Sequence, residues 1–203
     1  MGGAGRSALP SVTKGNNVMR DLSALGARPW AGRPFKGFPD AVLRDFESIF
    51  AISLPGDYVQ FLRFANGGIL DVCEYVDPVT NGIGVLNDFY GLGSRGTNEE
   101  MSKTGKWQYG NLWGETRSFN LNLLKGGRTL GVPFARDGGG NKCFLDYRDS
   151  LPCVSRLVVS TLHQYQLAPT FSAFLDLLRP ATRQSNELVK GQKSHKFRLG
   201  NPD

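Results

Sequence analysis

The sequence predicts an α+β fold in which helices pack on one face of a largely antiparallel or mixed β-sheet. Two segments with helical spacing of apolar residues come first, at residues 41–50 and 55–65. Short β-favouring segments follow between residues 69 and 160, and one more helical segment closes this region at 169–178. Helices that are separated from strands along the chain are typical of α+β domains.

The first predicted helix covers residues 41–50 and follows Pro39 and Asp40. Apolar residues recur in it at the i, i+4, i+7 and i+8 spacing of a single helix face. They are Val42, Phe46, Ile49 and Phe50. Residues 53–55, Ser-Leu-Pro, then interrupt the helical pattern, and a second helix begins at Pro55.

The second predicted helix begins at Pro55, where a residue without an N–H group loses no hydrogen bond. Asp57 adds a negative charge that is favourable near a helix N-terminus. One apolar face is formed by Tyr58, Phe61, Leu62 and Ala65. Residues 66–68, Asn-Gly-Gly, end the helix because glycine adopts the left-handed conformation that closes it. We expect Phe61 and Leu62 to be buried, at about 1.5–3 kcal/mol each.

β-favouring segments recur at short intervals after this helix. They are residues 69–76, 85–91, 129–135, 142–147 and 154–160. The stretch 91–118 shows no clear pattern, and we expect its aromatic residues to cover one edge of the core. These aromatic residues are Trp107, Tyr109 and Trp113. The last helix carries Phe171, Phe174, Leu175 and Leu178 on one face, and Pro180 stops it.

The most distinctive segment is the glycine-rich turn at residues 137–141, which lies between two apolar runs. A phosphate-binding loop needs a following helix and usually a Lys with Ser or Thr. The turn lacks a Lys followed by Ser or Thr. No helix follows it either, because residues 143–147 resemble a strand. We therefore predict a β-hairpin whose glycines supply positive φ angles.

Nucleophilic catalysis and metal binding have little support in the residue types. Cys73, Cys143 and Cys153 have no metal-binding spacing, and their apolar neighbours favour a buried role. His163 and His195 are the two histidines available as general bases. Cys143 and His163 could form a thiolate pair, but we expect no catalytic residue, no metal and no cofactor.

The net charge of +6 is concentrated at the two ends of the chain. Residues 1–35 carry +4 and residues 181–203 carry +3, whereas residues 36–180 carry −1. We predict a flexible basic N-terminal extension (1–35), a folded domain (36–180) and a basic C-terminal tail (181–203). The basic ends could bind nucleic acid weakly through its phosphates, but they lack the interleaved aromatic residues of a stacking platform.

The sequence also predicts a cytoplasmic protein. No apolar run reaches the roughly 18 residues of a membrane-spanning helix. The first residues lack the apolar core of a secretory signal, and an odd number of cysteines is consistent with a reducing compartment.

Three sequence blocks occur in a characteristic order. The first, at residues 54–68, contains Leu-Pro-Gly-Asp-Tyr-Val-Gln-Phe-Leu and ends in Asn-Gly-Gly. The second, at residues 133–146, contains Pro-Phe-Ala-Arg-Asp-Gly-Gly-Gly-Asn and Phe-Leu-Asp, and the third, at residues 168–175, contains Ala-Pro-Thr-Phe and Phe-Leu. Together they resemble the SUKH superfamily, which includes the yeast cell-wall synthesis regulators. The resemblance covers about residues 38–180 and implies helices packed against a mixed or antiparallel sheet.

This resemblance implies a protein that binds other proteins and has no catalytic residues in common with its relatives. Bacterial members commonly act as immunity proteins that bind and block a cognate polymorphic toxin, often a nuclease. We therefore predict a non-enzymatic immunity protein, with a regulatory scaffold for endogenous partners as the alternative. The basic net charge departs from the acidic surface that is usual for an inhibitor of a basic nuclease.

Polar and aromatic side chains near turns are the candidates for the partner-binding surface, because rigid strands would hold them in place. They are Asp137, Asp146 and Asp149, with Tyr90 or Trp113 as an aromatic anchor. Each also has a structural alternative: Asp137 can cap its turn, and Trp113 can belong to the core. Asp146 and Arg148 lie two residues apart on a strand and can pair on one face. The oligomeric state and the toxin are left open by the sequence.

Overall fold

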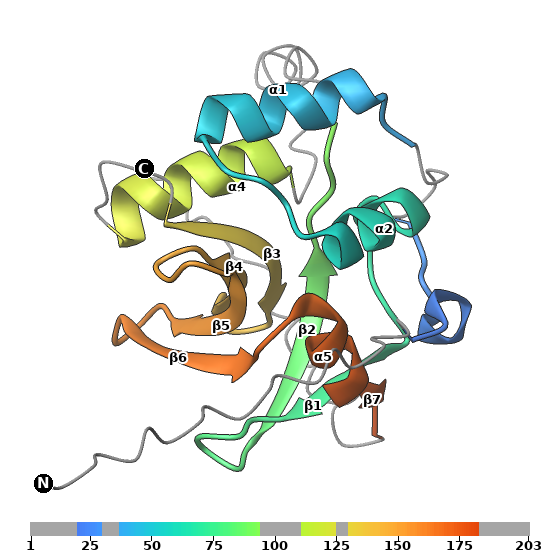
Figure 1. The fold of residues 1–203 in the computed structure, drawn as a ribbon. Coiled ribbons are helices and arrows are strands. Elements are labelled where there is room, and N and C mark those ends of the chain that lie inside the picture. Colours follow the sequence, from blue (N-terminus) through green and yellow to red (C-terminus); the bar gives the residue numbers. More distant parts are fainter. Residues whose placement is uncertain (1–19, 30–36, 94–110, 125–129, 183–203) are drawn as a thin grey trace, which may run out of the picture.

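The computed structural model describes residues 20–29, 37–93, 111–124 and 130–182, and Figure 1 shows their arrangement. The helices are α1 (Asp40–Phe50), α2 (Gly56–Phe64), α4 (Leu112–Ser118) and α5 (Phe171–Leu177). A short 3₁₀-helix, η1 (Leu22–Leu25), precedes them, and a π-helical turn, η2 (Phe119–Leu123), continues α4. The strands are β1 (Val72–Val76), β2 (Ile83–Phe89), β3 (Gly131–Asp137), β4 (Lys142–Asp146), β5 (Cys153–Val158), β6 (His163–Ala168) and β7 (Arg179–Pro180).

The strands form one curled sheet in the order β6-β5-β4-β3-β2-β1-β7, and every neighbouring pair is antiparallel. The predicted α+β fold is therefore confirmed, and so are the three predicted helices, which correspond to α1, α2 and α5. The five predicted strands correspond to β1 through β5. The sequence analysis did not predict β6, whose His-Gln-Tyr-Gln sequence lacks the alternation of apolar and polar residues that marks a half-buried strand.

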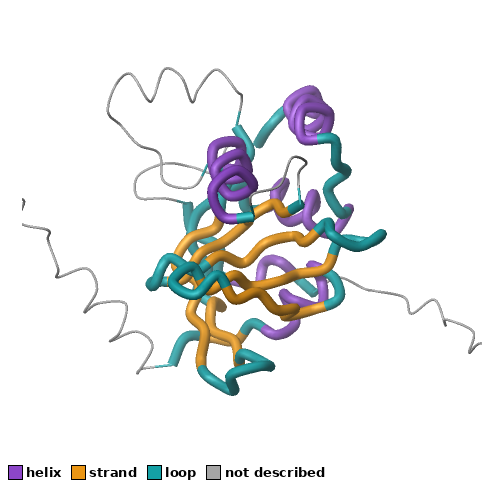
Figure 2. The backbone as a smooth tube through the Cα atoms, turned by 90° about the vertical axis from the view of Figure 1, so that its left-hand side faces the viewer, coloured by secondary structure: helices purple, strands orange, loops and turns teal. Residues whose placement is uncertain are grey.

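Helices flank the curled sheet (Figures 1 and 2). The main core is an aromatic cluster between α2, α5 and the inner face of the sheet. The ring of Tyr58 lies 4.9 Å from that of Phe171, and the ring of Phe134 on β3 lies 5.2 Å from that of Phe174. Asp57 at the start of α2 accepts hydrogen bonds from the backbone N–H and the hydroxyl of Ser172, at 2.7 and 2.9 Å. The two helices are thus joined by a capping carboxylate as well as by apolar contacts.

A second, smaller cluster lies on the opposite face of β4 and β5, where η2 covers the sheet. Phe144 on β4 lies between Cys143 and Leu145, which belong to the main core, so its ring points to the other face. There it meets Phe119 of η2, with ring centroids 4.9 Å apart. The buried amide of Asn120 accepts hydrogen bonds from the backbone N–H groups of residues 130 and 131 and donates to the carbonyl of Gly131. This amide fixes η2 against the first residues of β3.

The segment 20–29 packs against the folded body. Leu25 is fully buried, and Arg28 forms an antiparallel bridge with Ile69. Arg20 donates hydrogen bonds to the carbonyls of Leu175 and Leu178 at the end of α5, both at 2.8 Å. This part of the predicted N-terminal extension is therefore in contact with the domain. Residues 1–19, 30–36 and 183–203, with most of the two predicted basic ends, lie outside the described residues, as do Trp107 and Tyr109.

Candidate functional site

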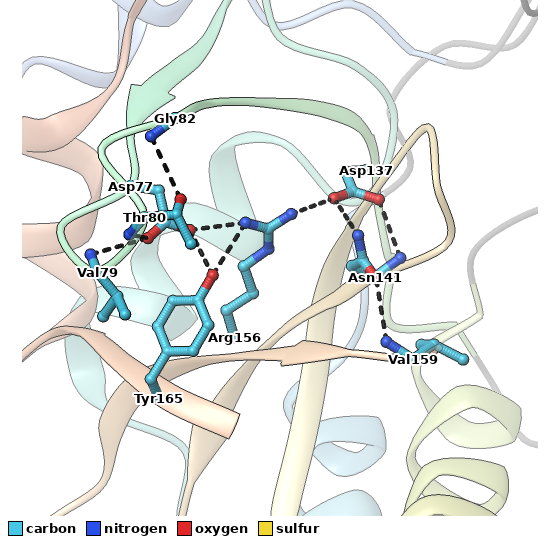
Figure 3. Close-up of polar contacts among 9 residues, drawn as sticks. All are labelled: Asp77, Val79, Thr80, Gly82, Asp137, Asn141, Arg156, Val159 and Tyr165. Carbon is cyan, nitrogen blue, oxygen red and sulfur yellow. Dashed lines mark hydrogen bonds and ion pairs between the residues drawn. The ribbon is translucent and has the colours of Figure 1, made fainter. Parts of the chain in front are cut away.

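Three hairpin turns lie at the same end of the sheet, because β1, β3 and β5 run in the same direction. They join β1 to β2, β3 to β4 and β5 to β6. A polar cluster connects these turns (Figure 3). We call it the Arg156 cluster, and it consists of Asp77, Asp137, Asn141, Arg156 and Tyr165.

Arg156 of β5 is the centre of the cluster. Its guanidinium reaches Asp77 Oδ2 through Nη1 at 2.6 Å and Asp137 Oδ2 through Nη2 at 2.8 Å. The Arg156 side chain is 14% exposed and that of Asp77 is 1% exposed, so this ion pair is almost removed from water. Buried guanidinium–carboxylate pairs are strongly bound because their hydrogen bonds are charge-assisted.

Asp77 also holds the turn between β1 and β2. Its Oδ1 accepts hydrogen bonds from the backbone N–H groups of Val79 and Thr80, at 2.9 and 3.0 Å. Its Oδ2 accepts a hydrogen bond from the hydroxyl of Tyr165 on β6. Because β1 and β6 are not neighbours in the sheet, these contacts show that the curl brings the β1–β2 turn back to the far edge.

Asp137 holds the glycine-rich turn in the same way. Its Oδ1 accepts hydrogen bonds from the backbone N–H groups of Gly139 and Asn141, both at 2.9 Å. Gly140 has a φ of +81°, which few other residues adopt. The β-hairpin predicted at residues 137–141 is confirmed, because β3 enters the turn and β4 leaves it. The turn N–H groups of Gly139 and Asn141 are bound by the chain's own carboxylate.

Asn141 extends the cluster to the third turn. Its side-chain oxygen accepts a hydrogen bond from the backbone N–H of Val159 at 3.0 Å, and its side-chain nitrogen donates to Asp137. One arginine, two carboxylates and one amide thus fix the positions of three turns that come from separate parts of the chain. Rigid, mutually fixed turns are a suitable framework for recognising another molecule.

The electrostatics of the cluster favour the ionised form of Asp77 and the neutral form of Tyr165. Burial raises the pKa of Asp77, but hydrogen bonds from Tyr165, Thr80, Val79 and Arg156 outweigh this and hold it at about 2. Burial and the hydrogen bond to Asp77 raise the pKa of the Tyr165 hydroxyl. At neutral pH the cluster therefore contains ionised Asp77 and a protonated tyrosine that donates to it.

Acid should weaken the protein through Asp77. Because its folded pKa lies below the unfolded value of about 3.9, its ionised form contributes stability that is fully present above about pH 4. This contribution, about 2 kcal/mol, should be lost as the pH falls from about 4 to about 2. Urea unfolding of the wild type and of Asp77→Asn at several pH values measures the difference. If the two proteins lose stability in parallel as the pH falls through this range, the ionisation of Asp77 does not contribute to the stability of the fold.

The structure places the other predicted site residues apart from the Arg156 cluster. Tyr90 is 1% exposed, and its hydroxyl accepts a hydrogen bond from Lys142 Nζ at 2.6 Å, which also pairs with Glu115 on α4. Trp113 is 6% exposed and packs edge-on against Phe46 with ring centroids 5.1 Å apart. Both aromatic side chains face the interior, so neither is available as an anchor in this conformation.

The two remaining carboxylates, Asp146 and Asp149, differ in burial. Asp146 is buried and pairs with Arg148, as the two-residue spacing predicted, and it also accepts a hydrogen bond from Ser155. Asp149 is exposed in the loop between β4 and β5. Of the five predicted residues, Asp137 alone belongs to the Arg156 cluster.

Sequence reasoning missed Arg156, Asp77 and Tyr165. The Asp77-Pro78 pair is typical of a turn, and it is the one local indication of the role of Asp77. The pairing of Asp77 with Arg156 joins residues 79 positions apart, so no local pattern reveals it.

The cysteines are placed as small apolar residues. Cys143 is 2% exposed, and burial raises the pKa of its thiol to about 12, although the charge of Arg156 acts in the opposite direction. It is therefore protonated at neutral pH, whereas a nucleophile needs the thiolate. His163, its hypothetical partner, is exposed on the edge strand, and its ring lies tilted against that of Tyr165 with centroids 5.4 Å apart. Within the described residues, His, Cys, Asp and Glu side chains do not gather in a group that could hold a metal ion.

The sequence profile of the SMI1 / KNR4 family (SUKH-1) matches residues 37–177, which include α1 through α5 and the whole Arg156 cluster. A comparison with curated proteins found no match. In the described part of the chain, no helix has the length and apolar character needed to cross a bilayer.

Proposed function

Because the chain belongs to the SMI1 / KNR4 family (SUKH-1), we propose that it is a non-enzymatic protein that acts by binding another protein. More narrowly, we propose that it is a cytoplasmic immunity protein that neutralises a cognate bacterial polymorphic toxin. The observation that carries the proposal is the match over residues 37–177, which spans β1 through β6 and the helices α1 through α5. The narrower role is supported by the resemblance to the SUKH superfamily, whose bacterial members commonly act as immunity proteins.

The charge arrangement supports a binding role. The four buried carboxylates of the described residues each have an arginine partner, and so does the half-buried Asp137. The four are Glu74 with Arg179, Asp77 with Arg156, Asp88 with Arg136 and Asp146 with Arg148. General acid–base catalysis needs carboxyl groups whose pKa values are moved toward neutrality. Buried carboxylates that pair with arginine serve the architecture instead, because they tie neighbouring strands and loops together.

The test is co-expression with a toxin. Each toxin-like domain encoded beside this gene is expressed in a bacterial host with and without the full chain, and growth is measured. We expect the chain to restore growth and to co-purify with one toxin domain as a stable complex. Failure of both readouts with every neighbouring toxin domain would contradict the immunity role. Stable binding to an endogenous protein of the source organism would then favour the regulatory scaffold.

A further inference from the structure

The outer side of β6 is one of the two edges of this sheet. β6 is the terminal strand and pairs with β5 on one side, in continuous register from Val158↔His163 to Ser155↔Gln166. The register shift in this pair lies further along, between Val154 and Ser155. Residues 163–166 therefore form a regular strand edge, and among the described residues no strand pairs with its outer side.

The two edges of the sheet are protected very differently. At one edge, β7 has two residues, and these are Arg179 and Pro180. A short strand, a charge and a proline are the usual means by which proteins prevent further pairing. At the other edge, β6 has six residues, His-Gln-Tyr-Gln-Leu-Ala, without proline, lysine or a carboxylate. The exposed Leu162, 48% accessible, lies immediately before it.

The packing beneath β6 holds this edge in place. The hydroxyl of Tyr165 is bound to Asp77 and Arg156, and Leu167 and Ala168 are buried in the main core. The strand is therefore already in the conformation that an added strand requires. Binding to a pre-organised edge avoids the entropy cost of ordering it.

We propose that the outer edge of β6 pairs with the same edge of a second copy of this chain. A two-fold axis through Tyr165 places Gln164 opposite Gln166 of the other copy, because paired antiparallel strands run in opposite directions. An amide both donates and accepts hydrogen bonds, so opposed glutamines are complementary to each other.

The edge carries no charge that would oppose pairing with a second copy. In self-pairing, a charged side chain near the axis would meet its own like charge, and residues 162–168 contain no Lys, Arg, Asp or Glu. A six-residue strand buries less than the roughly 800 Å² per partner of a standard interface. We therefore expect a weak dimer that dissociates on dilution. This inference does not depend on the proposed immunity role.

The experiment is sedimentation velocity of the full-length chain over a wide range of concentration. We expect the wild type to change from monomer to dimer as concentration rises. Gln166→Lys should weaken dimerisation about fivefold or more, because it introduces like charges on both sides of the axis. Gln60→Lys on α2, another exposed glutamine, is the matched control and should dimerise as the wild type does. Circular dichroism checks that each variant is folded.

A charge-reversal pair separates this interface from others. Gln166→Lys and Gln166→Glu should each dimerise poorly alone and should form a heterodimer when mixed. A wild type that stays monomeric at every concentration would overturn the proposal, and this includes the case in which the edge is covered by another part of the chain. A dimer that both Gln166 variants leave unchanged would also overturn it, because the interface would then lie elsewhere. The co-expression test with a toxin does not depend on dimerisation. Its growth readout therefore tests the immunity role whether or not the chain forms this dimer.

Discussion

Replacing Phe61 by Asp is expected to abolish the native fold. Phe61 on α2 is 1% exposed, and its ring lies 5.3 Å from those of both Phe89 and Phe171. Truncating a buried phenylalanine costs about 3–5 kcal/mol, and burying an unpaired carboxylate adds several more. A domain of this size has a total stability of about 5–15 kcal/mol. Far-ultraviolet circular dichroism and thermal unfolding of the variant should show loss of the cooperative transition.

Phe64→Asp is the matched control for this experiment. Phe64 lies on the same helix, but its side chain is 39% exposed. An exposed substitution of this kind usually changes stability by about 0.5 kcal/mol or less. If Phe61→Asp unfolds at the same temperature as Phe64→Asp, the placement of α2 against the sheet is wrong.

Arg156→Ala is expected to cost about 3–5 kcal/mol, because it leaves Asp77 buried without its cationic partner. The substitution also removes the ion pair to Asp137, whose side chain is 12% exposed. The three hairpin turns would then lose the side chain that joins them. Urea denaturation followed by tryptophan fluorescence measures the free energy of unfolding of the variant and of the wild type.

Arg63→Ala provides a comparison in which the ion pair is exposed. Arg63 pairs with Asp40 at 2.5 Å, but the two side chains are 46% and 65% accessible. Exposed pairs contribute about 0–1 kcal/mol, so this substitution should change stability little. A double-mutant cycle with Asp77→Asn isolates the Asp77–Arg156 interaction. If Arg156→Ala costs no more than Arg63→Ala, the Arg156 cluster does not stabilise the fold.

Local patterns in the sequence predicted most of the fold. The spacing of Phe61 and Leu62 predicted α2, and the glycine-rich turn at 137–141 predicted the hairpin of β3 and β4. These features depend on residues that are neighbours along the chain, where the helix and turn rules apply. The fold class followed from their order.

The features that local patterns did not predict depend on tertiary contacts. α4 has seven residues, and its Trp113 is held by Phe46 of α1, which lies 67 positions earlier in the sequence. η2 is stabilised by Asn120, whose amide bonds to the start of β3. β6 is a strand because β5 provides a pairing edge and Asp77 binds Tyr165. In each case the partner, and not the local sequence, decides the structure.

The positions of the predicted partner-binding residues also depend on tertiary contacts. Tyr90 and Trp113 were chosen because aromatic residues often anchor interfaces, but both are buried in this fold. Asp137 was chosen for its place near a turn, and its carboxylate caps that turn and binds Arg156. Residue type alone does not reveal which aromatic side chains reach the surface.

The Arg156 cluster also bears on how the chain folds. Its contacts join residues far apart in sequence, 79 positions for Arg156 with Asp77 and 88 for Tyr165 with Asp77. Contacts of such long range require the closure of large loops, and they slow folding when the transition state contains them. We expect this cluster to form after the rate-limiting step, when the curled sheet brings its distant turns together. Its energy would then act mainly on the rate of unfolding, and a chevron plot of Arg156→Ala would show a larger increase in the unfolding rate than decrease in the refolding rate.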